Sequence, residues 1–224
     1  TDSAAVNVKW RIATDTCISN VVDSGITSTD ASKDFSVKVN AAGLEPFTWY
    51  YYEFEAYGIK SVRGRTRTLP IGDTDSLRFA IVSCSNYTRG YFNVYTKITE
   101  RNDVFGVLHL GDFIYEKEGD FLALRDHDPD YEALNLADYR MRHSQYKLDE
   151  DLMRIHQQYP FFSVWDDHEV SNNSWYGGAS DHDSITEGPW FNRKSAGLKA
   201  YYEWMPWRLP DPIDTQRIYR KFRF

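Results

Sequence analysis

Apolar and polar residues alternate along the first part of the chain. An alternation of period two is typical of a β-strand with one face toward solvent. It occurs at residues 6–12 (VNVKWRI), 34–40 (DFSVKVN) and 50–56 (YYYEFEA). No helical spacing of apolar residues interrupts this part of the chain. The pattern therefore predicts β-structure up to about residue 69.

A turn signal precedes the third of these stretches. Leu44 and Pro46 stand shortly before Tyr50 in the sequence GLEPFTWY. This order is typical of the corner of a β-sandwich, where a tyrosine hydroxyl bonds to the backbone a few residues upstream. We therefore predict a small β-sandwich of the immunoglobulin or fibronectin (Ig/fibronectin-like) type over residues 1–70. Another kind of antiparallel β-domain is the alternative.

The hydrophobic pattern changes after residues 68–76. This stretch, TLPIGDTDS, is polar and contains the Pro and Gly that are typical of a linker. Three nearly continuous apolar runs follow, at residues 77–83, 104–110 and 160–165. Such runs are typical of parallel strands that are covered by helices on both faces.

Helical patterns lie between the second and third apolar runs. Apolar residues are spaced at steps of four, three and four, at Leu148, Leu152, Ile155 and Tyr159. Acidic residues near the start of this stretch favour a helix N-terminus. The stretch ADYRMRHSQY at residues 137–146 predicts another helix. Strands that alternate with helices predict an α/β domain, which we assign to residues 71–224.

Each apolar run ends at side chains that can bind a metal or a proton. The first run is followed by Cys84, and the second by Asp112 and Tyr115. The third ends in the charged run DDHE at residues 166–169. Ligands of open α/β sheets bind beyond the carboxyl ends of the strands. The coincidence at three predicted strands indicates a binding site rather than a solvated turn.

The residue types at these strand ends favour a metal. Carboxylates bind hard divalent ions and can bridge two of them, whereas a thiolate prefers iron or zinc. A tyrosine hydroxyl, with an ordinary pKa of about 10, becomes a ligand when a strong Lewis acid removes its proton. Cys84, Asp112 and Tyr115 together favour a trivalent ion, with iron first, beside a divalent neighbour. Zinc or another divalent ion is the alternative.

Charge and composition argue against several classes of function. The net charge of −7 argues against a nucleic-acid-binding surface, and no apolar segment is long enough for a transmembrane span. Cys17 and Cys84 permit one disulfide, but it would join two domains and we do not expect it. His127 and His182 lie in acidic loops. We expect both side chains to be solvated, although either loop could shape substrate access.

Four motifs of the second domain resemble those of a known family, the PhoD-type alkaline phosphatases and phosphodiesterases. They are SCS at 83–85, HLGDFIYE at 109–116, VWDDHEVSNNSW at 164–175 and AYYEWMPWR at 200–208. This family belongs to the calcineurin-like metallophosphoesterases and includes iron-dependent phospholipases D. The resemblance covers residues 77–224 and implies a layered α/β/β/α metallophosphoesterase-like fold, incomplete in this chain. The preceding β-domain also fits the family.

The resemblance implies a set of metal ligands. Cys84 and Tyr115 take the positions that bind Fe3+, and Asp112 takes the position that bridges it to Ca2+. Asp167 stands where related phosphoesterases have a metal-binding Asn. The family continues beyond the length of this chain, so we expect a missing C-terminal segment or a second polypeptide to complete the metal site.

The resemblance also implies roles for His168 and Asn172. His168 takes the position of the histidine that contacts the phosphate or protonates the leaving group. Asn172 is expected at the rim, where it binds calcium or a phosphate oxygen. From the residues themselves, we expect Asp166 to be the member of the acidic pair that only orients its neighbours by hydrogen bonds.

These features predict a metal-dependent phosphoesterase, secreted, periplasmic or associated with the cell wall. Its substrate would be a phosphodiester or a phosphomonoester, attacked by metal-activated water. A phospholipase D that cleaves the head group of a phospholipid is one alternative on the same scaffold. A non-catalytic module that binds a wall polymer or glycan is the other, with an incomplete catalytic half.

Overall fold

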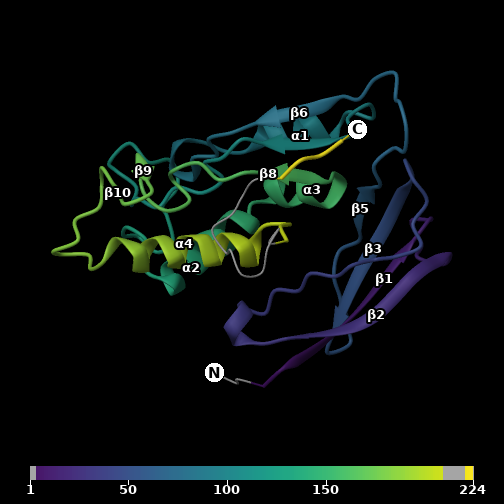
Figure 1. The fold of residues 1–224 in the computed structure, drawn as a ribbon, viewed down its shortest axis with the longest axis horizontal. Coiled ribbons are helices and arrows are strands. Elements are labelled where there is room, and N and C mark those ends of the chain that lie inside the picture. The colour runs from purple at the N-terminus through teal and green to yellow at the C-terminus, as the bar shows by residue number, and fades with distance from the viewer. Residues whose placement is uncertain (1–3, 209–219, 224) are drawn as a thin grey trace.

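The N-terminal part of the chain forms one antiparallel sheet. The structure, a computed structural model, describes residues 4–208 and 220–223. Strand β1 (Val6–Ala13) pairs with β2 (Val21–Thr29) on one side and with β3 (Trp49–Ala56) on the other. Two short strands complete the sheet along β3, namely β4 (Ile59–Lys60) and β5 (Gly64–Arg67). These strands lie together at the purple and blue end of the chain in Figure 1.

The predicted strand at residues 34–40 is wrong. A short 3-10 helix, η1 (Ala31–Lys33), begins at Asp30, whose side chain accepts from the backbone of the first turn. Asp34 and Phe35 then adopt positive φ angles of 50° and 55°, which turn the chain out of an extended path. Local turn bonds therefore replace strand pairing here. The paired strands in the described part of residues 4–70 belong to a single sheet, so the predicted sandwich is not confirmed.

The tyrosine corner that the sequence predicts is present. The hydroxyl of Tyr50 accepts a hydrogen bond of 2.7 Å from the backbone N–H of Glu45. The Tyr50 side chain is only 1% exposed, and Val8 and Ile12 of β1 are also buried. The alternation of β1 and the turn before β3 were therefore sufficient to locate the buried face of this sheet.

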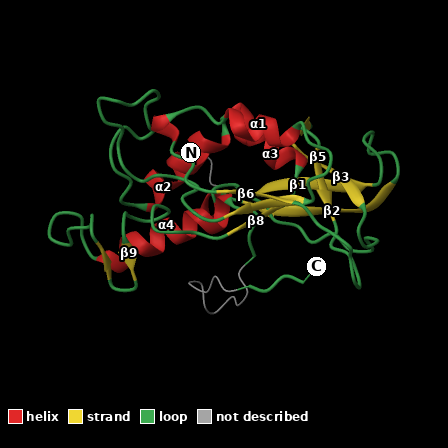
Figure 2. Cartoon of the chain, turned by 90° about the horizontal axis from the view of Figure 1, so that it is seen from above, coloured by secondary structure: helices red, strands yellow, loops and turns green. Residues whose placement is uncertain are grey.

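The second half of the chain contains the predicted parallel sheet. Strands β6 (Phe79–Val82), β7 (Gly106–His109) and β8 (Phe161–Ser163) pair in parallel in the order β6-β7-β8. Helices α1 (Asn93–Thr99) and α3 (Glu150–Gln158) lie against one face of this sheet, as Figure 2 shows. The parallel arrangement is confirmed, and it brings the carboxyl ends of the three strands to one edge.

Two further helices pack against each other beside the loops that follow these strands. Helix α2 (Leu136–Lys147) begins with a capping box between Asn135 and Asp138. Helix α4 (Trp190–Trp204) packs against α2. Between them along the chain lies a small hairpin of β9 (Ser174–Trp175) and β10 (Gly178–Ala179). A 3-10 turn, η2 (Tyr87–Arg89), follows β6. No helix among the described residues is both long enough and apolar enough to cross a membrane.

Helix α3 follows the predicted apolar spacing with one exception. Its N-cap is Asp149, and Leu152 and Ile155 are fully buried. Leu148 precedes the helix and is 73% exposed, so it does not belong to the buried face as predicted. The reason is that α2 ends at Lys147, and Leu148 forms the C-cap of that helix.

The two halves of the chain contact each other through α3. Arg65 of β5 donates to the carbonyl of Gln158 at 3.1 Å, and Gln157 donates to the carbonyl of Arg63 at 2.7 Å. The rings of Trp49 and Tyr159 meet edge to face with centroids 6.2 Å apart. The N-terminal sheet therefore packs against the end of the parallel sheet where its strands begin, away from the carboxyl ends of the strands.

Candidate functional site

Two of the strand-end loops run side by side. The N–H of Cys84 donates to the carbonyl of Gly111 at 3.2 Å, and the N–H of Ser85 donates to the carbonyl of Asp112 at 2.9 Å. Cys84 and Asp112 have positive φ angles of 57° and 53°. Non-glycine residues adopt this conformation at a cost, and such residues gather at functional sites. The backbone thus turns sharply at two of the predicted ligands, Cys84 and Asp112.

Asp112 lies at the centre of the site and is only 7% exposed. Its Oδ2 accepts a hydrogen bond of 3.0 Å from the Tyr115 hydroxyl and lies 3.5 Å from the Cys84 sulfur. Its Oδ1 is buried and has no hydrogen-bond partner within the described parts of the chain. A buried carboxylate oxygen without a donor is costly, and a cation would compensate it. The predicted grouping of these three side chains is therefore present.

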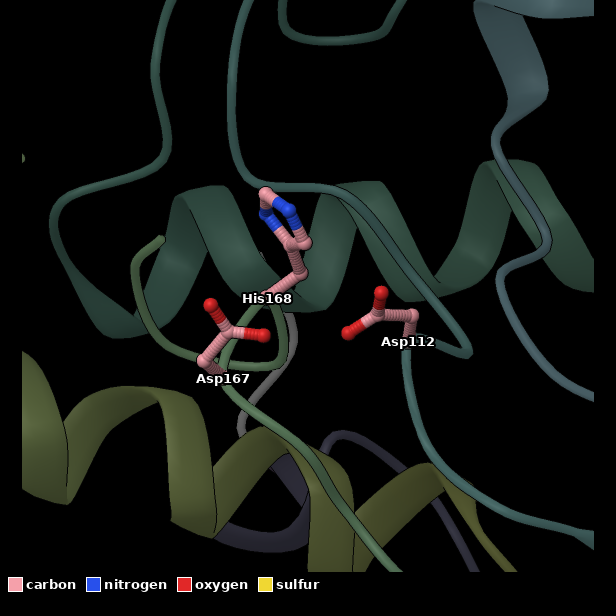
Figure 3. A group of neighbouring side chains, drawn as sticks. All are labelled: Asp112, Asp167 and His168. Atoms are coloured by element: carbon pink, nitrogen blue, oxygen red, sulfur yellow. The ribbon is translucent and has the colours of Figure 1, made fainter. Parts of the chain in front are cut away.

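The third strand end brings Asp167 and His168 to the same place. One ligand atom from each of Asp112, Asp167 and His168 lies within 4.8 Å of the other two. Figure 3 shows the two carboxyl groups pointing toward each other, with the imidazole beside them. Two carboxylates at this separation repel each other unless a positive charge lies between them. Burial, together with the charge of Asp112, raises the pKa of the Tyr115 hydroxyl. The donor set therefore fits a metal cation.

Glu169 holds the loops that carry these ligands, a role that we did not predict. Its fully buried carboxylate accepts from the backbone N–H groups of Phe113 at 2.6 Å, Asp166 at 2.8 Å and Asp112 at 3.2 Å. Burial raises the pKa of Glu169 to about 8, against the lowering effect of these N–H donors. Asp166 is exposed overall, but the partial burial of its carboxyl group, together with the charges of Asp112 and Asp167, raises the pKa of that group. Its predicted orienting role remains a prediction.

Glu116 orients the histidine, which is another role that we did not predict. Glu116 is fully buried and lies 2.7 Å from His168 Nδ1, while it also accepts from the N–H of Asn172 at 2.7 Å. The Tyr115 ring packs on the imidazole with centroids 4.2 Å apart. Burial opposes a charge on His168, but the bond to Glu116 and the nearby carboxylates raise its pKa overall. The spacing of Glu116 four residues after Asp112 was the available signal.

A polar pocket of about 710 Å³ opens beside these groups. Asn172 lies on its wall together with Tyr115 and His168, and its predicted binding of calcium or a phosphate oxygen stays a prediction. Two residues without a predicted role, Lys117 and Asp181, line the same wall and form an ion pair. The other lining residues are Asn86, Thr88, Arg89, Glu118, Gly119, Asp120, His127 and Glu132.

The prediction that His127 and His182 are solvated is wrong. His127 is 4% exposed, and its ring nitrogens lie 2.6 Å from the Lys117 carbonyl and 3.2 Å from the Tyr146 hydroxyl. The His182 side chain is 2% exposed and packs on the Trp190 ring at 5.2 Å. Both loops fold back onto helices, so their acidic composition did not reveal the position of the histidines. The disulfide that we did not expect is absent, because Cys17 and Cys84 are both free.

Comparisons with known proteins agree with this geometry. Residues 79–224 match the profile of the PhoD-like phosphatase family, and residues 1–70 match that of the PhoD-like phosphatase N-terminal domain. Alkaline phosphatase D of Bacillus subtilis (strain 168) is 38% identical over 98% of this chain and 39% of its own length. A solved structure described as "Structure of PhoD" superposes with a TM-score of 0.88 at 36% identity. It aligns with 96% of this chain and 42% of the solved one.

The chain thus spans about two fifths of the length of these relatives, and the matched part contains all three strand ends that form the site. The family profile covers well over half of the chain, and the fold and the sequence agree. The chain belongs to the PhoD-like phosphatase family.

Proposed function

We propose that this chain carries part of the catalytic site of a metal-dependent phosphoesterase. The observation that supports this most strongly is the convergence of Asp112, Asp167 and His168 from two strand ends, with one oxygen of Asp112 buried and unpaired among the described residues. A purely structural acidic cluster would pair such an oxygen with a donor. The substrate would be a phosphodiester or a phosphomonoester.

Cys84, Asp112, Tyr115 and Asp167 are the residues that would hold the metal. The thiol and phenol beside one carboxylate support iron, and the two carboxylates support calcium as its neighbour, with zinc or another divalent ion as the alternative. When bound, the metal supplies an activated water nucleophile and compensates charge on the phosphoryl group. A two-metal site takes more ligands than these side chains, so we propose that further protein residues complete it.

His168 would act as the general acid. Its Nδ1 is engaged by Glu116, so Nε2 is the nitrogen that remains for the substrate. The hydrogen bond to Glu116 favours the protonated ring, which can then donate from Nε2 to the leaving alcohol oxygen. Glu116 keeps the ring in this orientation and compensates its charge.

The pocket wall supports a hydrophilic alcohol over a phospholipid. Among the described residues that line it, none has an aliphatic hydrocarbon side chain. A site for lipid chains would need apolar walls, because burying acyl chains supplies the binding energy. Hydrolysis of a water-soluble diester, a monoester and a phospholipid by the same preparation distinguishes these substrates.

The central test is the substitution Asp112→Asn in the full protein. We expect loss of phosphoester hydrolysis and loss of bound metal, because the amide removes the negative charge that faces the cation. Asp126→Asn, in an exposed position, is the matched control and should keep both. The wild-type protein should contain iron and show a visible charge-transfer band from the thiolate and phenolate. Full activity of the Asp112 variant would overturn the proposal and favour the binding module.

A further inference from the structure

Asp181 makes two contacts on the wall of the pocket. Its Oδ2 accepts from the side-chain amide nitrogen of Asn172 at 3.2 Å, and it also accepts from the ammonium group of Lys117. Asp181 belongs to the loop that follows β10, whereas Asn172 follows the β8 strand end. All three side chains line the pocket beside His168. The contact therefore joins two loops at the site.

This contact permits only one orientation of the Asn172 amide. An ionised carboxylate accepts hydrogen bonds but cannot donate them, whereas an amide has one donor side and one acceptor side. The nitrogen must face Asp181, so Oδ1 occupies the opposite side of the amide. The backbone of Asn172 cannot turn freely either, since its N–H is bound by the buried carboxylate of Glu116. The oxygen is thus the atom left for a ligand in the pocket.

Lys117 keeps Asp181 in the form that this selection needs. The ammonium group of Lys117 donates to the same oxygen, Oδ2, that accepts from the Asn172 amide. An ammonium group can only donate, so Oδ2 of Asp181 is held as an acceptor. The ion pair also compensates the charge of Asp181, so this carboxylate does not add to the negative charge of Asp112 and Asp167.

A buried arginine holds the loop that carries Asp181. Arg193 of α4 is 1% exposed, and its Nη1 donates to the Asp181 carbonyl at 3.4 Å and to Glu187 at 2.8 Å. Its Nε donates to the Tyr139 hydroxyl at 3.1 Å, and that hydroxyl donates to the carbonyl of Val170. One guanidinium group thus connects both loops whose side chains meet at the pocket wall.

We propose that Asp181 is a positioning residue that selects the amide orientation of Asn172, so that the Asn172 oxygen faces the cation in the pocket. The inference rests on the proposed function, because it assumes that a cation binds beside Asp112 and Asp167. It assigns Asp181 no contact with the reacting atoms. Its effect reaches the reaction only through Asn172, and this makes it testable by a double-mutant cycle.

The experiment compares the wild-type protein with Asp181→Asn, Asn172→Ala and the double variant, all in the full chain. An amide at position 181 can either donate or accept, so the Asn172 amide loses its preferred orientation. Asp183→Asn is the matched control, because Asp183 stands in the same loop but is exposed and bonds only locally to Ile185 and Thr186. The readouts are kcat/KM on a soluble phosphodiester, calcium affinity by titration calorimetry, and the thermal midpoint.

We expect Asp181→Asn to lower kcat/KM and calcium affinity roughly tenfold in the wild-type background and less than twofold in the Asn172→Ala background. Asp183→Asn should change neither. Equal losses in both backgrounds, no loss, or a gain would overturn the inference, as would a wild-type protein that binds no calcium. A wild-type protein that binds calcium but hydrolyses no phosphoester would contradict the proposed function alone. In that case the double-mutant cycle measured by calcium affinity decides the role of Asp181.

Discussion

Glu169→Gln tests whether one buried carboxylate holds the metal-binding loops in place. One oxygen of Glu169 accepts from the N–H of Asp112 and of Asp166, and the other accepts from Phe113. A glutamine can keep its oxygen at the first position, where it satisfies two donors. Its amide nitrogen then faces the N–H of Phe113, so two donors oppose each other in a fully buried place. One unsatisfied buried N–H costs about 1–3 kcal/mol.

We therefore expect the free energy of unfolding of Glu169→Gln to fall by about 1–3 kcal/mol. Activity should fall as well, because the residue after Asp112 loses its anchor and a misplaced ligand weakens the metal site. Urea unfolding at pH 9, where Glu169 with its pKa of about 8 is ionised, gives the free energy of unfolding, and metal content and kcat are measured on the same preparations.

Glu100→Gln is the control for this experiment. Glu100 forms an exposed ion pair with Lys97, and such a pair is worth roughly 0–1 kcal/mol. Its loss should leave the metal content and kcat unchanged. If Glu169→Gln is as stable, as active and as rich in metal as the wild-type protein, the loops are held by other contacts and the assignment of Glu169 is wrong.

Three further substitutions have defined outcomes. His168→Asn should lower kcat about 10²–10⁴-fold and keep the metal; loss of the metal would show that His168 is a ligand. Gly111→Ala should lower the free energy of unfolding by at least about 2 kcal/mol, because φ at Gly111 is 111° and the new Cβ would lie 2.5 Å from the Asp166 Cβ. In the same unfolding assay, Gly90→Ala should cost far less, because a Cβ at Gly90 meets open space. Burial lowers the pKa of His143 to about 3, below the value of about 6.5 in the unfolded chain. The contribution of His143 to folding stability is therefore complete above pH 6.5 and is about 2 kcal/mol smaller at pH 5. In His143→Phe the thermal midpoint should fall less between pH 7.5 and pH 5 than in the wild-type protein, and an equal fall would contradict this.

Hydrophobic periodicity and the polar strand ends predicted most of the architecture that positions the site. The three apolar runs became parallel strands, but β6 has no buried residue and Ile81 is 65% exposed, so the predicted burial on both faces is not met at this strand. That arrangement alone brought Cys84, Asp112 and Asp167 to one edge. The corner at Tyr50 was also predictable, since its turn residues and its tyrosine lie within one short stretch.

Features that depend on tertiary contacts were not predictable from local pattern. Residues 34–40 alternate like a strand, but the turn bonds at Asp30 and the positive φ of Phe35 direct the chain elsewhere. His127 lies in an acidic loop, yet that loop folds over the buried guanidinium of Arg142, which donates to the carbonyl of Pro129 at 2.8 Å. A residue's neighbours in sequence do not reveal such partners.

The acidic residues of the site divide into two groups by what they accept. Glu116 and Glu169 are fully buried, and both oxygens of each have a partner from the chain. Asp112 is nearly as buried, yet its Oδ1 has no partner in the described residues. The same side-chain chemistry therefore serves two purposes at one edge of the sheet. The carboxylates of Glu116 and Glu169, which accept from several hydrogen-bond donors, fix the loops. Because these donors are bound to the two glutamates, Oδ1 of Asp112 remains available for a cation.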